Sequence, residues 1–289
     1  MQIVTDSGTD LWIPREQRTN PEVHVVPLAV TLDGHTYREG LDIETQEFYR
    51  LLAASQNLPI TSQPSAGDFA AVYRQLAAHD PEILSIHISS GLSGTVNAAQ
   101  AGAQEVPEAH VTVVDTKTLS VASGWQVEAA WRAARAGWDT PRTLELLARI
   151  SDTAFSLYTL RELKYLIHGG RISHMKGLVA SVLNIKPIIG VEREFGKYVQ
   201  MGQARTFNAA LEALAGLMAK QYSEGSKVRA QVMNSNDPAG AELLRQAVDR
   251  RFDCTWLPMM PISLVLGAHT GPSLVAAAIA PMDVIAEMP

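Results

Sequence analysis

The sequence predicts an α/β protein built from two α/β domains. In the first half, apolar runs of strand length alternate with segments of helical spacing, which is typical of a mostly parallel sheet with helices on both faces. In the second half, two strand patterns flank Glu194-Phe195-Gly196, so we expect a β-hairpin and an α+β domain with a mixed sheet. A length of 289 residues also favours two domains. We place them at residues 1–152 and 153–289.

Elements of the first half follow from apolar spacing and from the residues at their ends. Strands are expected at 2–5, 23–32, 83–88 and 110–115, and Pro27 makes the second an edge strand or a bulged one. Helices are expected after a cap at Thr45, after the capping box of Ser65 and Asp68, from Thr95, over 119–136 with Gly137 at its end, and from Thr140-Pro141.

Elements of the second half show the same signals in a different order. We expect a strand at 154–160, a helix at 161–167, a break at Gly169-Gly170-Arg171, hairpin strands at 183–191 and 197–201, a helix capped by Thr206, a strand at 227–233 and a helix starting at Asp237-Pro238. Two further apolar segments, 254–260 and 274–279, flank the segment His269-Thr270-Gly271-Pro272.

Charge and cysteine content narrow the class of protein. The formal charge of −6 and the absence of a basic run argue against nucleic-acid binding. The single cysteine, Cys254, excludes an internal disulfide and fits a reducing compartment. The chain opens directly on a strand without the pattern of a signal peptide, and no apolar run is long enough to span a bilayer. We therefore expect a cytoplasmic protein without a transmembrane segment, which leaves room for a transient contact with a membrane.

Residues 82–100 are the stretch best suited to hold a ligand. The apolar run at 83–88 predicts a strand, and the segment from Thr95 is helical in pattern. Between them lies a loop of hydroxyls and glycines, Ser89-Ser90-Gly91-Leu92-Ser93-Gly94. Gly91 and Gly94 are expected to adopt positive φ and to let a ligand approach the backbone, while the hydroxyls and the first N–H groups of the helix favour an anion.

No motif of an enzyme or of a cofactor site accompanies this loop. The sequence has no Walker motif, no dinucleotide fingerprint and no H-E-x-x-H pattern, so we assign no ATP site, no cofactor, no metal and no catalytic residue. Gly91-Leu92-Ser93-Gly94 misses the nucleophile elbow by one position. Hydroxyls without a base suggest that an oxyanion is bound and not transformed. Each loop alone is read as turn and cap residues, and only their combination favours a site.

That combination resembles the DegV family of bacterial fatty-acid-binding proteins. The motifs stand in family order along nearly the whole chain. They are Asp6-Ser7, Thr61-Ser62-Gln63-Pro64-Ser65, Ser89-Ser90-Gly91-Leu92-Ser93-Gly94-Thr95, Gly169-Gly170-Arg171-Ile172-Ser173, Leu183-Asn184-Ile185-Lys186-Pro187-Ile188 and His269-Thr270-Gly271-Pro272. The resemblance implies two α/β domains with one long-chain fatty acid buried between them. It also implies a carrier role, in which a separate ATP-dependent fatty acid kinase phosphorylates the carboxylate that this protein presents.

The resemblance also implies which residues form the site. Thr61 and Ser93 would bind the carboxylate, lined by Ser62, Gly94 and Thr95 with His269 nearby, and Arg171 and Arg205 would face the kinase or the transferring phosphoryl group. Apolar segments 178–183 and 262–266 are expected to line the tail.

Two departures from the family pattern stand out, and other functions stay open beside the carrier. Arg38-Glu39 replaces a usual aspartate and is expected to matter little for the head group, whereas Ser273-Leu274 affects the shape of the pocket. A stand-alone serine-dependent acyl hydrolase or transferase, and a binding protein for a small phosphorylated metabolite, remain alternatives.

Overall fold

The first part of the chain forms a four-stranded parallel sheet. The computed structural model describes residues 1–13, 23–175 and 185–289. The strand order is β2 (Val23–Val26), β1 (Gln2–Asp6), β6 (Glu82–His87) and β7 (His110–Asp115), and all three pairings are parallel. Apolar residues stand in consecutive positions, as in Ile3-Val4 on β1 and Ile83-Leu84 on β6. Both sheet faces are therefore apolar and need helices to cover them. The predicted parallel sheet is confirmed.

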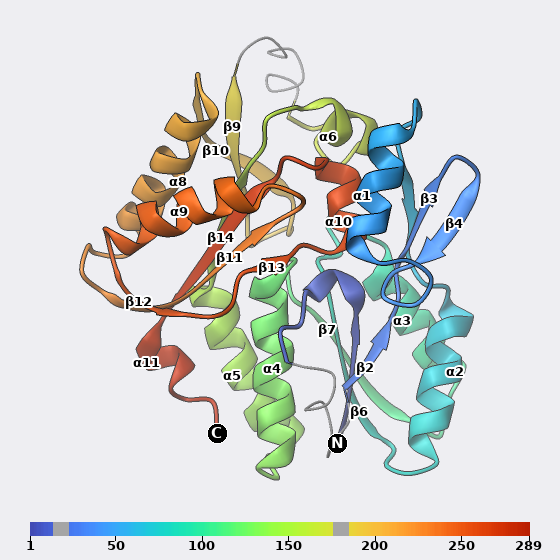
Figure 1. Ribbon diagram of the computed structural model, residues 1–289. Coiled ribbons are helices and arrows are strands. Elements are labelled where there is room, and N and C mark those ends of the chain that lie inside the picture. The colour runs from blue at the N-terminus through green and yellow to red at the C-terminus, as the bar shows by residue number, and fades with distance from the viewer. Residues whose placement is uncertain (14–22, 176–184) are drawn as a thin grey trace.

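Helices cover both faces of this sheet (Figure 1). On one face, Val4 and Ile83 pack in a core with α2 (Ala66–Ala77) and α3 (Thr95–Gln104). On the other face, Ile3 and Leu84 pack in a core with α4 (Val121–Arg135), whose neighbour is α5 (Thr140–Thr153). Because α4 is buried along almost its whole length, it must be covered on its far side as well.

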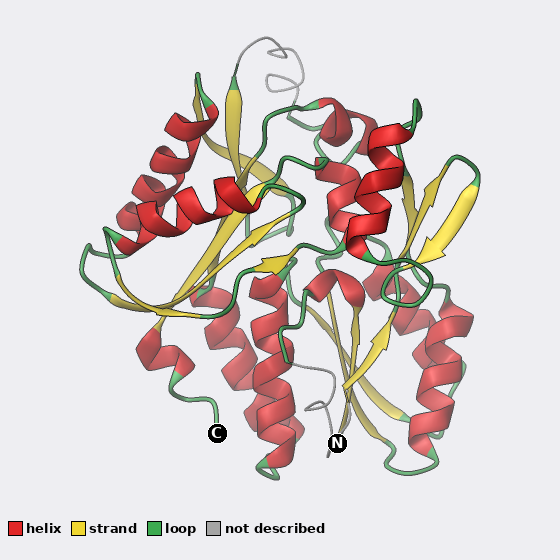
Figure 2. Ribbon diagram, viewed as in Figure 1, coloured by secondary structure: helices red, strands yellow, loops and turns green. Residues whose placement is uncertain are grey.

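The second sheet provides that cover (Figure 2). Its strand order is β10 (Tyr198–Ala204), β9 (Lys186–Val191), β8 (Phe155–Thr159), β14 (Val275–Pro281), β11 (Lys227–Asn234) and β12 (Asp253–Trp256), with the short β13 (Met260–Pro261) also paired to β11. Alanines on one face of β14 pack against the layer of α4 and α5. On its other face, Val275 and Ile279 pack with α8 (Phe207–Gln221) and α9 (Pro238–Asp249). Parallel and antiparallel pairings both occur, so the predicted mixed sheet and hairpin are confirmed.

The expected strand at 23–32 is wrong as a single element. The chain leaves the first sheet after β2, and β3 (Ala29–Leu32) joins β4 (His35–Arg38) and β5 (Ile60–Ser62) in a small antiparallel sheet. Pro27 has no N–H to continue a ladder, and the N–H of Leu28 donates to Ser7 Oγ at 3.1 Å. The proline therefore marks a change of sheet and not a bulge.

Three helix starts also differ from those expected. α1 (Thr45–Ala54) has Glu44 at its N-cap, so Thr45 lies inside it. α5 is capped by Asp139, whose carboxylate accepts the N–H of Arg142 at 3.0 Å, and Thr140 is its first helical residue. α6 (Lys164–Gly169) begins three residues later than expected. The capping box of α2 and the caps of α8 and α9 are confirmed.

A short helix near the C-terminus ties the two halves together. α10 (Leu264–Thr270) lies beside α6, β3 and β5 (Figure 1), and its Leu264 and Ala268 share a core with Val30 and Phe48. The boundary at residue 152 falls in the last turn of α5 and stays a prediction. The last helix, α11 (Met282–Ile285), follows β14.

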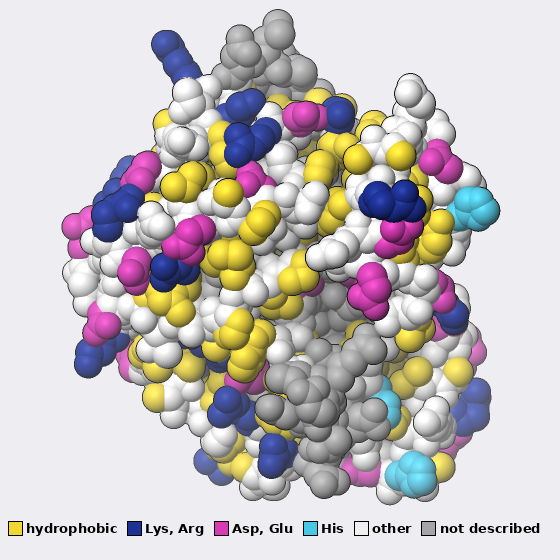
Figure 3. Space-filling model, viewed as in Figure 1, with side chains coloured by type: hydrophobic (Ala, Val, Ile, Leu, Met, Phe, Trp, Pro, Cys, Tyr) yellow, Lys and Arg dark blue, Asp and Glu magenta, His cyan; other side chains and the backbone are white. Residues whose placement is uncertain are grey.

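The surface in Figure 3 mixes charges of both signs with apolar side chains, without a continuous basic patch on that face. In the described part of the chain, no helix combines the length and the apolarity needed to cross a bilayer.

Candidate ligand-binding site

A cavity of about 220 Å³ lies where the two sheets and α10 meet. Its lining comes from both halves of the chain: Leu28, Thr61, Ser62, Gln63, Ile88, Leu92, Ser93, Leu119, Arg171, Tyr198, Val265, Leu266 and His269. Ser62, Gln63 and Arg171 are exposed, whereas the leucines and isoleucine of the lining are mostly buried. The cavity therefore has a polar mouth and an apolar interior, which suits a ligand with one charged end.

Thr61 and His269 meet at this cavity. Thr61 lies on β5 and His269 in the last turn of α10, and Thr61 Oγ1 is 2.7 Å from His269 Nε2. Burial, together with the positive charge of Arg171 and the neighbouring His168, lowers the pKa of His269 to about 4. The imidazole is therefore neutral at physiological pH and acts as a hydrogen-bonding group without charge.

The backbone at the end of α6 leaves just enough room for that histidine. A Cβ atom on Gly169 would stand 2.2 Å from His269 Nδ1. No real contact is that short, so only glycine fits here. The Gly-Gly-Arg segment, which the sequence shows as a break, therefore holds His269 against Thr61.

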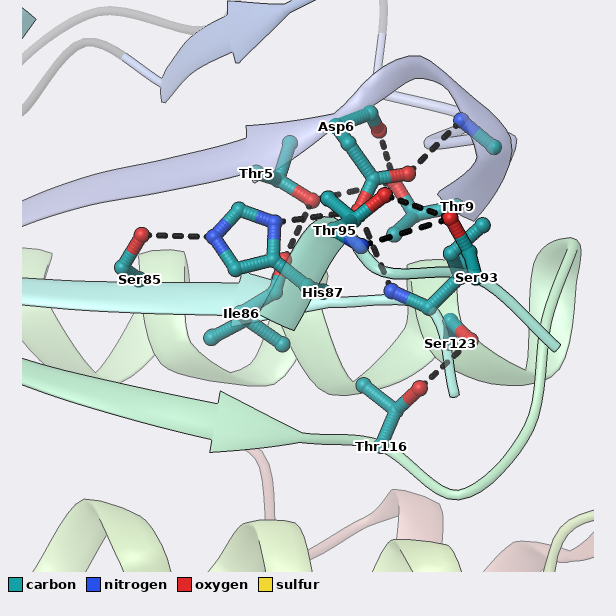
Figure 4. Close-up of polar contacts among 12 residues, drawn as sticks. Thr5, Asp6, Thr9, Ser85, Ile86, His87, Ser93, Thr95, Thr116 and Ser123 are labelled. Carbon is teal, nitrogen blue, oxygen red and sulfur yellow. Dashed lines mark hydrogen bonds and ion pairs between the residues drawn. The ribbon is translucent and has the colours of Figure 1, made fainter. Parts of the chain in front are cut away.

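Ser93 lines the cavity and Thr95 supports it from behind. Their hydroxyl oxygens are 2.8 Å apart, and the N–H of Thr95 donates to Ser93 Oγ at 3.3 Å. Figure 4 shows the two hydroxyls pointing toward each other at the carboxyl end of the first sheet. Thr95 is fully buried at the start of α3, and Gly94 is the N-cap. Of the expected carboxylate ligands, Gly94 and Thr95 thus do not line the cavity and instead fix the position of Ser93.

The glycines of this loop serve contacts within the protein. A Cβ on Gly91 would stand 2.1 Å from the carbonyl oxygen of Phe195, and one on Gly94 would stand 2.3 Å from the amide oxygen of Gln63. Ser89 Oγ donates to the carbonyl oxygen of Gly196 at 2.8 Å. Neither Gly91 nor Gly94 has positive φ, so that expectation is wrong. Gly91 leaves no space for a ligand, because the turn between β9 and β10 packs directly against it.

The two predicted arginines lie in different places. Arg171 lines the cavity, and its guanidinium donates to the carbonyl oxygens of Gly169 at 2.7 Å and Leu92 at 3.4 Å. Arg205 is exposed just after β10 and is not part of the cavity lining. Seven residues of nearly extended chain separate it from Tyr198, a distance of roughly 20 Å. The structure therefore brings Arg171 to the site and leaves Arg205 away from it.

A buried carboxyl, Asp10, and a partly buried one, Glu39, anchor α10 to the first half of the chain. Glu39 Oε2 accepts hydrogen bonds from Ser7 Oγ at 2.8 Å and Ser263 Oγ at 2.7 Å, and Asp10 Oδ1 accepts the N–H of Ser263 at 2.8 Å. Burial raises the pKa of both carboxyls. Sequence reasoning missed Asp10 and gave Glu39 little weight, although both hold the helix that carries His269. Their only sequence signals were the polar run Asp6-Ser7-Gly8-Thr9-Asp10 after β1, which contains Asp10, and the departure at Arg38-Glu39.

A second, smaller and mainly apolar pocket adjoins the cavity, and we call it the deep part of the site. Leu119, Tyr198 and Leu266 line both parts, and the deep part measures about 20 Å³. It is completed by Ser120, Ser156, Tyr158, Met233, Ile262, Thr270, Leu274 and Ala276. The expected tail segment 262–266 thus contributes to both parts, whereas segment 178–183 lies outside the described residues. Leu119, Tyr198 and Tyr158 were missed, because single apolar residues in strands and loops carry no motif.

A serine, a histidine and an aspartate do line up elsewhere, but inside the core. His87 Nδ1 is 3.0 Å from Asp6 Oδ2, and His87 Nε2 is 2.7 Å from Ser85 Oγ (Figure 4). All three side chains are fully buried, and Ser85 Oγ also lies 2.7 Å from the hydroxyl of Tyr73. A substrate cannot reach this array, so it has the geometry of a triad without its chemistry. Among the described residues, no group of His, Cys, Asp and Glu is arranged to hold a metal ion.

The fold and the site define an α/β protein with a cavity between a parallel and a mixed sheet. The family model described as "Uncharacterised protein, DegV family" matches residues 1–282. A DegV domain-containing protein of Lactococcus lactis is 34% identical over 278 residues, which cover 94% of this chain and 96% of the relative. Another, from Staphylococcus aureus, is 32% identical over 269 residues, with 93% and 94% covered. The chain belongs to the DegV family.

Solved structures confirm the fold. A DegV family protein from Thermus thermophilus, described as fatty acid binding, is 32% identical with a TM-score of 0.86 and covers 97% of this chain and 99% of its own. DegV from Bacillus subtilis, described as a fatty acid binding protein, is 26% identical with a TM-score of 0.86, and 97% and 98% are covered.

Proposed function

We propose that this protein binds a long-chain fatty acid in the cavity between its two sheets. One observation carries the proposal: a cavity with a polar mouth containing Thr61, Ser93, Arg171 and His269 shares three lining residues with a deeper, mainly apolar pocket. An amphiphile with one anionic end matches both parts. The fatty acid binding described for the Thermus thermophilus and Bacillus subtilis relatives supports the same ligand class.

The carboxylate would be held by hydroxyl donors at the mouth. When the His269 ring carries its proton on Nε2, it donates to Thr61 Oγ1 and leaves the Thr61 hydroxyl proton for the ligand. Ser93 donates from the opposite loop, Ser62 lines the same mouth, and Gly94 and Thr95 keep Ser93 in place. Arg171 stands at the same mouth, but its guanidinium already donates to the carbonyl oxygens of Gly169 and Leu92, so we assign the carboxylate to the hydroxyl donors.

The tail would supply most of the binding free energy. Burial of alkyl groups contributes roughly 0.8 kcal/mol per methylene, so a long chain contributes on the order of 10 kcal/mol before ordering costs. The deep space of about 20 Å³ is close to the volume of one water probe. Side chains there, such as Leu266 and Met233, must therefore move apart when the tail enters.

We further propose that the bound carboxylate is presented to a separate ATP-dependent fatty acid kinase. Arg171 stands at the mouth, where it can pair with the transferring phosphoryl group or with an acidic patch on the kinase. Arg205 is exposed and roughly 20 Å away along β10, so its role is docking the partner. The protein itself would be a carrier without an ATP site of its own.

Fatty acid titration and acyl phosphate formation, measured on the same preparations with the cognate kinase and ATP, test this carrier role. We expect Arg171→Ala to bind fatty acid nearly normally but to form acyl phosphate far more slowly, and Arg205→Ala to do so less severely. Arg250→Ala is the control, because Arg250 is exposed on the second domain and pairs with Glu212. Normal turnover of Arg171→Ala contradicts the carrier role for this residue, and esterase turnover abolished by Ser93→Ala supports the hydrolase instead.

A further inference from the structure

The deep part of the site is lined by several hydroxyl groups, although a hydrocarbon tail cannot form a hydrogen bond with any of them. Ser120, Ser156, Tyr158 and Thr270 all contribute to its lining. Tyr158 is only 6% exposed, and among the described residues its phenol oxygen has no hydrogen-bond partner. Buried hydroxyls are nearly always paired in proteins. An unpaired one on the wall of a ligand cavity therefore points to a group on the ligand.

The alternation of β8 places Tyr158 on the cavity side. Ser156 and Tyr158 face the cavity, while Leu157 packs in the core beneath α8 and α9 on the other face. The rings of Tyr158 and Tyr198 meet edge to face with centroids 5.6 Å apart. Burial and the nearby hydroxyl of Tyr198 raise the pKa of Tyr158, but the two hydroxyls do not meet with the geometry of a hydrogen bond. The Tyr158 proton is therefore available to a ligand.

The neighbouring hydroxyls have the complementary capacity. Ser120 Oγ donates to a carboxyl oxygen of Asp10, and Thr270 Oγ1 donates to the carbonyl oxygen of Leu266 at 2.9 Å. Each of these hydroxyls already donates its proton to a protein oxygen, but its lone pairs can still accept a hydrogen bond. The deep end thus offers one free donor, Tyr158, beside two acceptors. A group that both donates and accepts a hydrogen bond satisfies this set, and an alcohol is the smallest such group.

We propose that the preferred ligand is a hydroxy fatty acid, with its hydroxyl on the distal half of the chain and Tyr158 as the residue that selects it. This inference rests on the proposed function, since it assumes that the tail enters the deep space. The ligand hydroxyl accepts from Tyr158 and donates to Thr270 or Ser120. A saturated tail covers the phenol without pairing it, and that unmade bond lowers its affinity.

The test is a titration of three acids with three proteins, all below the concentration at which the acids form micelles. The acids are octadecanoic acid and its 10-hydroxy and 12-hydroxy derivatives. The proteins are the wild type, Tyr158→Phe and Thr159→Val. Thr159 is the matched control, because it is the next residue on β8, is fully buried, and has an unpartnered hydroxyl but does not line the cavity. Thermal unfolding of each variant verifies folding.

For the wild type we expect at least one hydroxy acid to bind ten times more tightly than octadecanoic acid, which corresponds to about 1.4 kcal/mol. Tyr158→Phe should lose this preference by weakening the hydroxy acid and strengthening the saturated one, and Thr159→Val should keep it. Equal binding of all three acids by the wild type overturns the inference and leaves fatty acid binding intact. A preference that survives in Tyr158→Phe also overturns it. Binding of none of the acids contradicts the proposed function itself.

Discussion

Thr61 Oγ1 and His269 Nε2 lie 2.7 Å apart although 208 residues separate them in the chain. The contact joins β5, in the small sheet of the first half, to α10 near the C-terminus. It closes the polar mouth of the cavity with one hydrogen-bonding group from each half of the chain. The proposed carboxylate site requires that His269 stay neutral and remain hydrogen-bonded to Thr61.

The first prediction concerns pH and His269. Its pKa of about 4 in the folded protein lies below the unfolded value of 6.5. Between these two pH values the unfolded chain binds more protons at residue 269 than the folded protein does. The contribution of neutral His269 to the free energy of unfolding is therefore complete above pH 6.5 and is lost as pH falls toward 4. We expect the free energy of unfolding of the wild type, relative to His269→Gln, to fall by about 3 kcal/mol between pH 7 and pH 4. Urea unfolding at several pH values measures this, and parallel curves for the two proteins would refute it.

A second prediction concerns the glycine behind the histidine. Gly169→Ala places a methyl group 2.2 Å from His269 Nδ1, so the ring must move away from Thr61. We expect fatty acid affinity to fall about tenfold, as expected for the loss of one hydrogen bond to a charged ligand. Gly216→Ala is the control, because its Cβ would meet nothing closer than 4.0 Å and alanine favours a helix. If Gly169→Ala binds fatty acid as tightly as Gly216→Ala, the position of His269 against Thr61 is not required for binding.

The third prediction is that two serine substitutions have different effects, one on fatty acid binding and the other on the stability of the fold. Ser93 lines the cavity, so Ser93→Ala should weaken fatty acid binding by roughly 1.5–3 kcal/mol with little change in unfolding. Ser85 is fully buried between His87 and Tyr73, so Ser85→Ala should destabilise the fold by roughly 1–3 kcal/mol. Calorimetric titration and chemical unfolding of both variants check this. The reverse pattern would place the ligand at the buried array.

The fourth prediction concerns the layer between the two sheets. Glu128 on α4 forms a buried ion pair with Arg229 on β11 and also binds Arg132. Arg229→Met leaves the Glu128 carboxylate buried with only the half-exposed Arg132, and we expect a cost of about 3–5 kcal/mol. Replacing both partners, as in Glu128→Leu with Arg229→Met, should cost less than the single change. A double variant as unstable as Arg229→Met alone would show that packing, and not charge, dominates.

Local signals in the sequence predicted much of the fold. The capping box of Ser65 and Asp68, the start of α9 at Asp237-Pro238 and the hairpin around Glu194-Phe195-Gly196 are decided by residues within a few positions of each other. Alternating apolar strands and helices were enough to predict the parallel sheet. These features depend on residues that are close together in the sequence, so they can be predicted without knowledge of long-range contacts.

The rest depends on contacts that sequence spacing does not contain. Pro27 showed an interruption, but not that β3 would find its partners in β4 and β5. Asp10 and Glu39 gained their role only when Ser263 came to lie between them. Gly91 was read as open to a ligand, because the turn that fills the space lies more than 100 residues away. Residue types in the site could be named from motifs, but their arrangement could not.

Lipid extraction tests the central claim most directly. Protein purified without added lipid is measured by native mass spectrometry, then extracted with organic solvent, and the extract is analysed by mass spectrometry. The account predicts one long-chain fatty acid per chain, released by denaturation and absent as a covalent adduct on Ser93. A protein that is consistently free of fatty acid, and that also fails to bind it on titration, would contradict the account.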